Sequence, residues 1–137
     1  MSISTVLRGR TALVTGATAG IGKAVAQNLA RQGAQVVLHG RDQARGEALV
    51  KEITAEGGTA RFIAADLTDA ADTLRLAAEA GAVDVLVNNA GLYDFAPTAA
   101  TDAATFDRQI AVNTRAPWEG RAPPTRQGPA SEESGLF

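Results

Sequence analysis

Several residue types are scarce in this chain, and their scarcity excludes whole classes of chemistry. The 137 residues include no cysteine, one histidine (His39) and one tyrosine (Tyr93). Serine occurs only at positions 2, 4, 131 and 134, so residues 5–130 contain none. A cysteine nucleophile, a serine nucleophile and a Cys/His metal cluster are therefore excluded from the body of the chain, and we expect no metal site.

The charge of the chain is low and its signs are mixed. Thirteen Lys and Arg against 15 Asp and Glu give a formal net charge of −2, and 45% of the residues are hydrophobic. A soluble globular domain fits this composition, and no basic stripe marks nucleic acid or an anionic membrane as a partner. No apolar run reaches the roughly 18 residues of a membrane span, and the N-terminus does not resemble a signal peptide. We therefore expect a cytoplasmic protein.

Short apolar runs alternate with longer segments of helical period, which is typical of a parallel sheet with crossover helices. Strands are expected at residues 11–15, 35–39, 60–64 and 84–87. The first crossover helix should end near Gly33 and bury a stripe formed by Ile21, Ala24, Val25 and Leu29, interrupted at Asn28. The fold class predicted is a doubly wound, Rossmann-like α/β sheet.

Acidic residues mark the expected starts of the later helices. Asp42 should cap the second helix, and either Asp69 or Asp72 the third. Inward-facing apolar residues are expected to be Leu49 and Ile53 on the second helix and Leu74 and Leu76 on the third, with Gly57–Gly58 and Gly81 as their ends. A fourth helix should begin near Thr101–Asp102, with one face formed by Phe106, Ile110 and Ala111.

The periodic pattern stops after Trp118. Residues 117–137 contain four of the five prolines and few apolar residues. Such a segment buries too little apolar surface to offset the ordering entropy of its backbone. We expect an incomplete Rossmann-like domain over residues 1–116, followed by an irregular, disordered tail over residues 117–137; a short loop folded onto the domain is the alternative.

A glycine-rich segment, Thr15-Gly16-Ala17-Thr18-Ala19-Gly20-Ile21-Gly22, joins the first expected strand to the first helix. Glycines allow a tight turn and a close approach to a ligand, and the first helical turn points N–H groups at an anion. A tight turn without a ligand is the simpler interpretation. The position of the segment at the first strand-to-helix turn favours a dinucleotide site instead.

The end of the second expected strand bears on the choice of dinucleotide. NAD-binding units place an acid here, which pairs with the ribose 2′-hydroxyl. This chain has Gly40 followed by Arg41, whose guanidinium could bind the 2′-phosphate of NADP. We therefore expect NADP(H) rather than NAD(H). The alternative is a solvated Arg41 neutralised by Asp42.

Four motifs, in this order and spacing, resemble those of the short-chain dehydrogenase/reductase family over about residues 8–118. They are the turn with Gly16, Gly20 and Gly22, then Asp66-Leu67, then Asn88-Asn89-Ala90-Gly91, and Asn113 in the fourth helix. The resemblance implies an oxidoreductase that transfers a hydride between NADP(H) and a carbonyl or alcohol. The cofactor-binding residues implied are Thr15, Gly16, Thr18, Gly20, Ile21, Gly22, Arg41, Asp66, Leu67, Asn88, Ala90 and Gly91.

The resemblance also implies a proton relay formed by Tyr, a Lys four residues later, Ser and the helix-four Asn. A cation near the Tyr is needed because an unperturbed Tyr titrates near about 10. Here Pro97 stands four residues after Tyr93, and Asn113 alone matches the relay. Tyr93 is interpreted as a rim residue of the nicotinamide pocket and His39 as a strand-end residue near the adenine side. We therefore expect a catalytically incompetent chain, truncated after about four strands and four helices.

Two other hypotheses remain open at this point. The chain could be an NADP(H)-binding module that acts without catalysis and pairs with another copy or a relative through its fourth helix or its exposed sheet edge. It could also be an unproductive, frameshifted fragment that folds poorly. The coding sequence downstream separates these two, because a frameshift predicts another reading frame that encodes Ser and Tyr-xxx-Lys.

Overall fold

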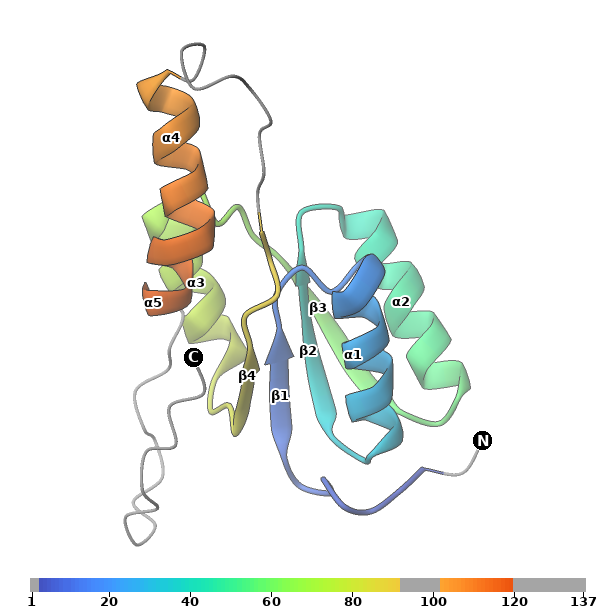
Figure 1. Cartoon of the computed structure of the whole chain (residues 1–137). Coiled ribbons are helices and arrows are strands. Elements are labelled where there is room, and N and C mark those ends of the chain that lie inside the picture. The colour runs from blue at the N-terminus through green and yellow to red at the C-terminus, as the bar shows by residue number, and fades with distance from the viewer. Residues whose placement is uncertain (1–2, 92–101, 120–137) are drawn as a thin grey trace, which may run out of the picture.

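The computed structural model describes residues 3–91 and 102–119. One parallel sheet contains β1 (Thr11–Val14), β2 (Gln35–Gly40), β3 (Thr59–Ala64) and β4 (Val85–Val87), in the order β3-β2-β1-β4 (Figure 1). Each strand agrees with its predicted range to within one residue at either end. The order reverses direction between β1 and β4, and at such a switch point the carboxyl ends of the strands leave room for a ligand.

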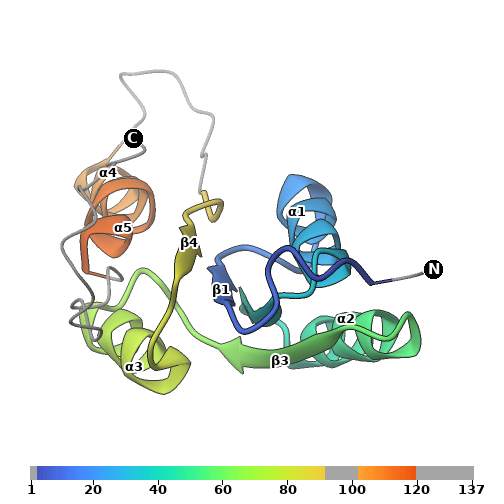
Figure 2. The same ribbon diagram turned by 90° about the horizontal axis from the view of Figure 1, so that it is seen from below.

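Helices cover both faces of the sheet, so the predicted doubly wound α/β fold is confirmed. One face is covered by α1 (Gly20–Arg31) and α2 (Gln43–Ala55) (Figures 1 and 2). The other face is covered by α3 (Ala70–Ala80) and by the inner part of the last helical segment. That segment consists of α4 (Ala103–Ile110), the π-helical turn η2 (Ala111–Arg115) and α5 (Ala116–Glu119).

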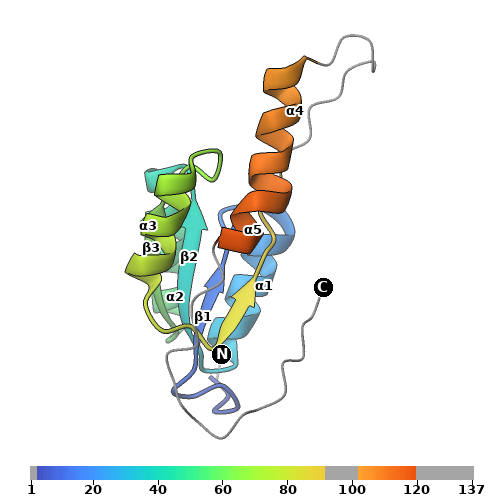
Figure 3. The ribbon, with the colours of Figure 1, turned by 90° about the vertical axis from the view of Figure 1, so that its left-hand side faces the viewer.

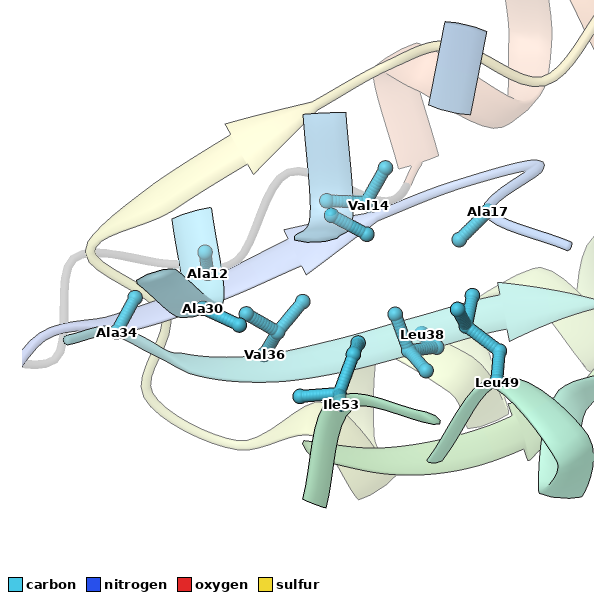
Figure 4. Close-up of a cluster of buried hydrophobic side chains, with 10 residues drawn as sticks. Ala12, Val14, Ala17, Ala30, Ala34, Val36, Leu38, Leu49 and Ile53 are labelled. Atoms are coloured by element: carbon cyan, nitrogen blue, oxygen red, sulfur yellow. The ribbon is translucent and has the colours of Figure 1, made fainter. Parts of the chain in front are cut away.

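Two apolar layers hold the helices to the sheet, because successive strand residues point to opposite faces. On the α1/α2 side, Val14 and Leu38 are 0% exposed and belong to one cluster with residues of both helices (Figure 4). Leu49 and Ile53 of α2 belong to this layer, as predicted. On the opposite side, Leu13 packs in a cluster with Leu76 of α3 and with η2.

Aspartate side chains begin three of the helices. Asp42 caps α2 by accepting a hydrogen bond from the backbone N–H of Arg45, and Asp102 caps α4 in the same way. For α3 the cap is Asp69, which accepts from the backbone of Ala71 and Asp72, so the choice between Asp69 and Asp72 is settled. α1 differs, because its N-cap residue, Ala19, offers no side-chain hydrogen bond. The N–H groups at the start of α1 are therefore left for another acceptor.

The predicted inner face of α1 is right at Val25 and Leu29, which pack against the core, and wrong at Ile21 and Ala24, which are exposed. Ile21 is 77% exposed, and the residues of α1 that face the sheet are Gly22, Ala26 and Ala30, flanked by Val25 and Leu29. Glycine is required at position 22 because a Cβ there would meet the carbonyl oxygen of Gly16 and the side chain of Asn89. Leu74 on α3 is likewise exposed, at 55%, whereas Leu76 is buried as predicted.

The last helical segment extends further than the sequence indicates. It continues through Pro117 to Glu119, so residues 117–119 are helical rather than part of an irregular tail. Residues 120–137, the remainder of that predicted tail, lie outside the described residues. Pro117 has no N–H to donate four residues back, and the π-helical turn directly precedes it, where regular α-helical hydrogen bonding is interrupted. Of the predicted face of α4, Ala111 is buried, but Phe106 and Ile110 are 59% and 44% exposed.

Candidate functional site

A cleft of about 290 Å³ opens at the carboxyl edge of the sheet. Of the predicted site residues, those that line it are Gly16, Thr18, Arg41, Asp66, Leu67, Ala90 and Gly91. The sequence-based site omits other residues of its lining, namely His39, Gly40, Thr68, Asn89 and Val112. Four segments at the carboxyl ends of the strands thus meet at one place, together with Val112 of η2.

The turn between β1 and α1 requires glycine for two reasons, a left-handed backbone conformation and a close approach of two segments. Gly16 and Gly20 have φ angles of 63° and 57°, in the left-handed region that disfavours larger residues. Gly22 has an ordinary φ, but a Cβ there would meet the carbonyl oxygen of Gly16 and the side-chain amide of Asn89. The glycines therefore bring the start of α1 against the turn and leave its N–H groups facing outward.

Thr15 and Asn89 join this turn to the end of β4. The buried Thr15 hydroxyl oxygen accepts hydrogen bonds from the backbone N–H groups of Asn89 and Ala90, both at 3.0 Å. In return, the Asn89 side-chain amide donates to the carbonyl oxygen of Gly16 at 3.1 Å. Thr15, a predicted cofactor residue, does not line the cleft and instead supports the turn from below. Asn89 belongs to the Asn-Asn-Ala-Gly motif, but spacing alone did not indicate which asparagine faces the turn.

His39 links the turn to the loop after β3. Its ring is 3% exposed, with Nδ1 3.1 Å from the backbone nitrogen of Gly16 and Nε2 2.9 Å from the carbonyl oxygen of Ala65. Burial lowers the pKa of His39 below its ordinary 6.5, with the hydrogen bond to Ala65 opposing that shift. The residue lies near the end of β2, as expected. Its hydrogen bonds to two other segments were not predicted from the sequence.

Arg41 and Asp66 form the polar side of the cleft. Arg41 is exposed, and no ion pair involves it within residues 3–91 and 102–119. Asp42 does not neutralise it, because the Asp42 carboxylate caps α2 and lies 3.9 Å from Arg45 Nε. The hydroxyl and backbone N–H of Thr68 donate to Asp66 at 2.7 and 2.9 Å and lower the pKa of that carboxyl. The cleft therefore holds a guanidinium that forms no salt bridge among the described residues, and a fixed carboxylate whose pKa that guanidinium also helps to lower.

The other predicted residues lie around the cleft rather than on its wall. Gly20, Ile21 and Gly22 form the first turn of α1, beside the opening. Asn88 lines a separate cavity of only about 10 Å³ beneath. Asn113 is exposed on η2, one residue after Val112, which does line the cleft. Tyr93 lies outside the described residues, so the structure does not place it.

Neither a metal cluster nor a membrane helix is found in the part of the chain that the structure describes. No three side chains of His, Cys, Asp or Glu come together there in an arrangement that could hold a metal ion. No described helix is long and apolar enough to cross a membrane.

Comparison with known proteins identifies the lineage of this site. A family model described as short chain dehydrogenase matches residues 10–122, which includes all four motifs. The chain belongs to the short-chain dehydrogenase family. Sorbitol dehydrogenase of Cereibacter sphaeroides is 40% identical over 111 residues, covering 78% of this chain and 42% of that protein. L-rhamnose 1-dehydrogenase (NAD(P)(+)) of Azotobacter vinelandii is 48% identical over 98 residues, covering 66% of this chain and 38% of that protein.

Solved structures of short-chain dehydrogenases share the fold closely. A metagenomic short-chain oxidoreductase in complex with NADP superposes with a TM-score of 0.78 at 42% identity, covering 83% of this chain and 54% of that one. The 3-oxoacyl (acyl-carrier-protein) reductase of Agrobacterium tumefaciens with NADP bound gives a TM-score of 0.79 at 41% identity, covering 83% of this chain and 45% of that one. The chain thus spans less than half the length of the curated relatives and about half that of these structures.

Proposed function

We propose that this chain binds NADP(H) in the cleft at the carboxyl edge of the sheet. The observation that carries the proposal is that the Arg41 guanidinium, which forms no salt bridge among the described residues, lies at the same opening as the glycine turn. Solved members of the family at 42% and 41% identity hold NADP, which supports a dinucleotide at the equivalent place. Cleft, charge and lineage therefore favour the same ligand.

The start of α1 supplies the site for the pyrophosphate. Ala19 leaves the first N–H groups of α1 without a side-chain acceptor, and the positive end of the helix dipole lies at the same point. The exposed Ile21 and the glycines at 20 and 22 keep the approach to these N–H groups open. A diphosphate that lies against this turn would provide the missing acceptors.

Arg41 distinguishes NADP(H) from NAD(H). Placed directly after β2, its guanidinium can form a charge-assisted pair with the 2′-phosphate of an adenosine bound between Thr18 and Asp66. An acid at the preceding position would repel that phosphate, but the residue there is Gly40. A Cβ on Gly40 would meet Thr18 Cγ2 at 2.7 Å, so the cleft is narrow at this point.

The reaction of the family is hydride transfer between the nicotinamide, which supplies or accepts the hydride when bound, and a carbonyl or alcohol. We propose that the chain alone does not complete this reaction. Proton transfer needs an activated acid or base, and the sequence offers neither a Lys four residues after Tyr93 nor a Ser between residues 5 and 130. Asn113 on η2 remains as the one residue that matches the relay.

Calorimetric titration of the full chain with NADP⁺ and with NAD⁺ tests the proposed cofactor. We expect tighter binding of NADP⁺. Arg41→Ala should weaken NADP⁺ binding about tenfold or more and NAD⁺ binding less than twofold, because a charge-assisted pair contributes about 1.5–3 kcal/mol. Arg45→Ala is the matched control, since Arg45 is exposed and pairs with Asp42 away from the cleft lining. Absence of heat with either dinucleotide at millimolar concentration would refute the proposal.

Two further measurements separate the remaining hypotheses. Oxidation of NADPH by the chain with a panel of carbonyl substrates should not exceed the rate without protein, and turnover above that rate would contradict catalytic incompetence. The hypothesis of a poorly folding fragment predicts gradual unfolding in urea. A single steep transition, shifted to higher urea by NADP⁺, would instead support a folded cofactor-binding domain.

A further inference from the structure

His39 lines the cleft, and hydride transfer does not use it, although both nitrogens of its ring are hydrogen-bonded. It lies between the two walls that a dinucleotide would contact. One wall is the β1–α1 turn beginning at Gly16, and the other is the loop of Ala65, Asp66 and Leu67 after β3. Each ring nitrogen of His39 faces one of these walls.

The two partners fix the protonation state of the ring. The backbone nitrogen of Gly16 carries a hydrogen and can only donate, so Nδ1 must be an unprotonated acceptor at 3.1 Å. The carbonyl oxygen of Ala65 can only accept, so Nε2 must carry the proton at 2.9 Å. This is the neutral Nε2–H tautomer. A protonated imidazolium would carry hydrogens on both nitrogens and would set the Nδ1 hydrogen against the Gly16 N–H.

We propose that His39 is a positioning residue that joins the glycine turn to the β3–α3 loop, and that its protonation releases Gly16 and weakens dinucleotide binding. The proposal deepens the assigned NADP(H) site and rests on it. Gly16 begins the turn for the pyrophosphate, and Ala65 directly precedes the residues that line the adenine side. A single ring therefore fixes the separation of the two walls that hold the ends of one ligand.

The charges around His39 act in opposite directions. Asp72 on α3 favours the imidazolium and Arg41 after β2 disfavours it. Asp66 lies on the loop beside Ala65, and the turn on the other side, residues 16–19, carries no charged side chain. Burial is the dominant influence and holds the pKa of His39 below 6.5. The ring is therefore neutral near pH 7 and becomes charged only in acid.

The same proton links pH to stability. Below about pH 6.5 the unfolded chain, with an ordinary imidazole, binds more protons than the folded chain. The free energy of unfolding contributed by this group is therefore fully present above pH 6.5 and falls as the pH drops below it.

Two amide variants of His39 each keep one of its two hydrogen bonds and lose the other. Asn at position 39 places an amide oxygen near the position of Nδ1 and keeps the acceptor for Gly16. Gln places an amide nitrogen near the position of Nε2 and keeps the donor for Ala65. Neither side chain titrates. His39→Asn should therefore retain the support of the glycine turn at every pH, whereas His39→Gln should lose it at every pH.

Calorimetric titration with NADP⁺ between pH 5 and 8 tests the proposal. We expect the affinity of the native chain to fall about fivefold more than that of His39→Asn on going to pH 5, because one acceptor of a buried N–H is lost. The 2′-phosphate of NADP⁺ itself titrates near 6, roughly, but it does so equally with both proteins. The difference between the two pH profiles of affinity therefore isolates the effect of His39. His39→Gln should bind about fivefold more weakly at pH 8. Superimposable profiles of all three proteins would overturn the proposal.

Nuclear magnetic resonance of the chain without ligand gives an independent readout. His39 is the one histidine in the sequence, so its imidazole signals need no further assignment. We expect the Nε2–H tautomer at pH 7.5 and a Gly16 amide signal that shifts with the same midpoint as the ring. An Nδ1–H tautomer, or a Gly16 signal indifferent to the titration, would refute the link. If the link holds and NADP⁺ does not bind at any pH, the proposed cofactor is wrong and the joining role of His39 stands.

Discussion

Gly22 shows how closely the start of α1 packs against the glycine turn beside the cleft. It lies in the first turn of α1, where the backbone of Gly16 and the side chain of Asn89 occupy the space that a Cβ would need. The hydrogen bond from Asn89 to the Gly16 carbonyl depends on the same approach. A methyl group at position 22 therefore has to displace the turn, the helix or the asparagine.

Gly22→Ala should accordingly destabilise the fold by about 1–3 kcal/mol, the usual cost of an overfilled site, and weaken NADP⁺ binding. Urea unfolding and calorimetric titration measure the two effects. Asn28→Ala, on the exposed face of the same helix, is the control and should stay within about 0.5 kcal/mol of the native chain. Native-like stability and affinity of Gly22→Ala would show that the turn adapts freely.

Residues that line the cleft were easier to predict from the sequence than residues that hold it together. The spacing of the glycines, Arg41 and Asp66 identified much of the lining, because each follows a strand at a position set by the parallel sheet. The bonds of His39 and Thr15 were not predictable in this way. Each joins segments brought together only by the sheet order, and neither residue type indicates by itself which backbone groups it will meet.

At the level of whole elements, α1 differs from its neighbours in how it begins. α2, α3 and α4 each start at an aspartate that accepts backbone hydrogen bonds, whereas α1 starts at Ala19, in extended conformation with φ of −154°. That geometry suits a capping side chain, and none is present. A bound anion at this point would supply the stability that a cap adds to the other helices.

Ala19→Asp should therefore raise stability and lower affinity at once. A capping carboxylate should add about 0.5–1 kcal/mol to the free energy of unfolding without ligand. The same negative charge would repel the pyrophosphate, and we expect NADP⁺ to bind about tenfold more weakly. Ala19→Ser supplies an uncharged cap and controls for the hydrogen bond alone. Unchanged NADP⁺ affinity in Ala19→Asp would place the pyrophosphate elsewhere.

Strands and helix starts were predictable because they depend on local pattern, but the inner face of α1 was predicted only in part, at Val25 and Leu29. The largest apolar residue of its first turn, Ile21, dominated the predicted stripe, yet it is exposed and the glycine beside it faces the sheet. Close packing favoured small residues over apolar ones at that position. The end of the last helix was missed for a different reason, since a π-helical turn lets the helix continue through Pro117.

At the scale of the whole molecule, α4 stands apart from the two packed layers. It extends beyond the carboxyl edge of the sheet (Figures 1 and 3). None of its residues is buried, and Phe106 and Ile110 are exposed in neighbouring turns. Among the described residues, β4 pairs on one side only, with β1. The exposed apolar side chains of α4 and the unpaired edge of β4 therefore lie on the same side of the fold.

We therefore predict that the chain self-associates and that α4 contributes the larger part of the contact. The double variant Phe106→Ser, Ile110→Ser should shift the sedimentation profile toward the monomer, because burying each of these side chains contributes about 1.5–3 kcal/mol. Leu74→Ser, which removes an exposed leucine from α3, should leave the profile unchanged. A native chain that sediments as a clean monomer at all concentrations would contradict the prediction.

The pairing of β1 with β4 sets an order in time for the assembly of the fold. Ala12 pairs with Val85. The hydroxyl of Thr15 accepts hydrogen bonds from the N–H groups of Asn89 and Ala90, which lie 74 and 75 residues later in the chain. During synthesis, β1, β2 and β3 with their two crossover helices emerge first and can pair as neighbours. The glycine turn therefore gains its support from Asn89 only after β4 has joined β1.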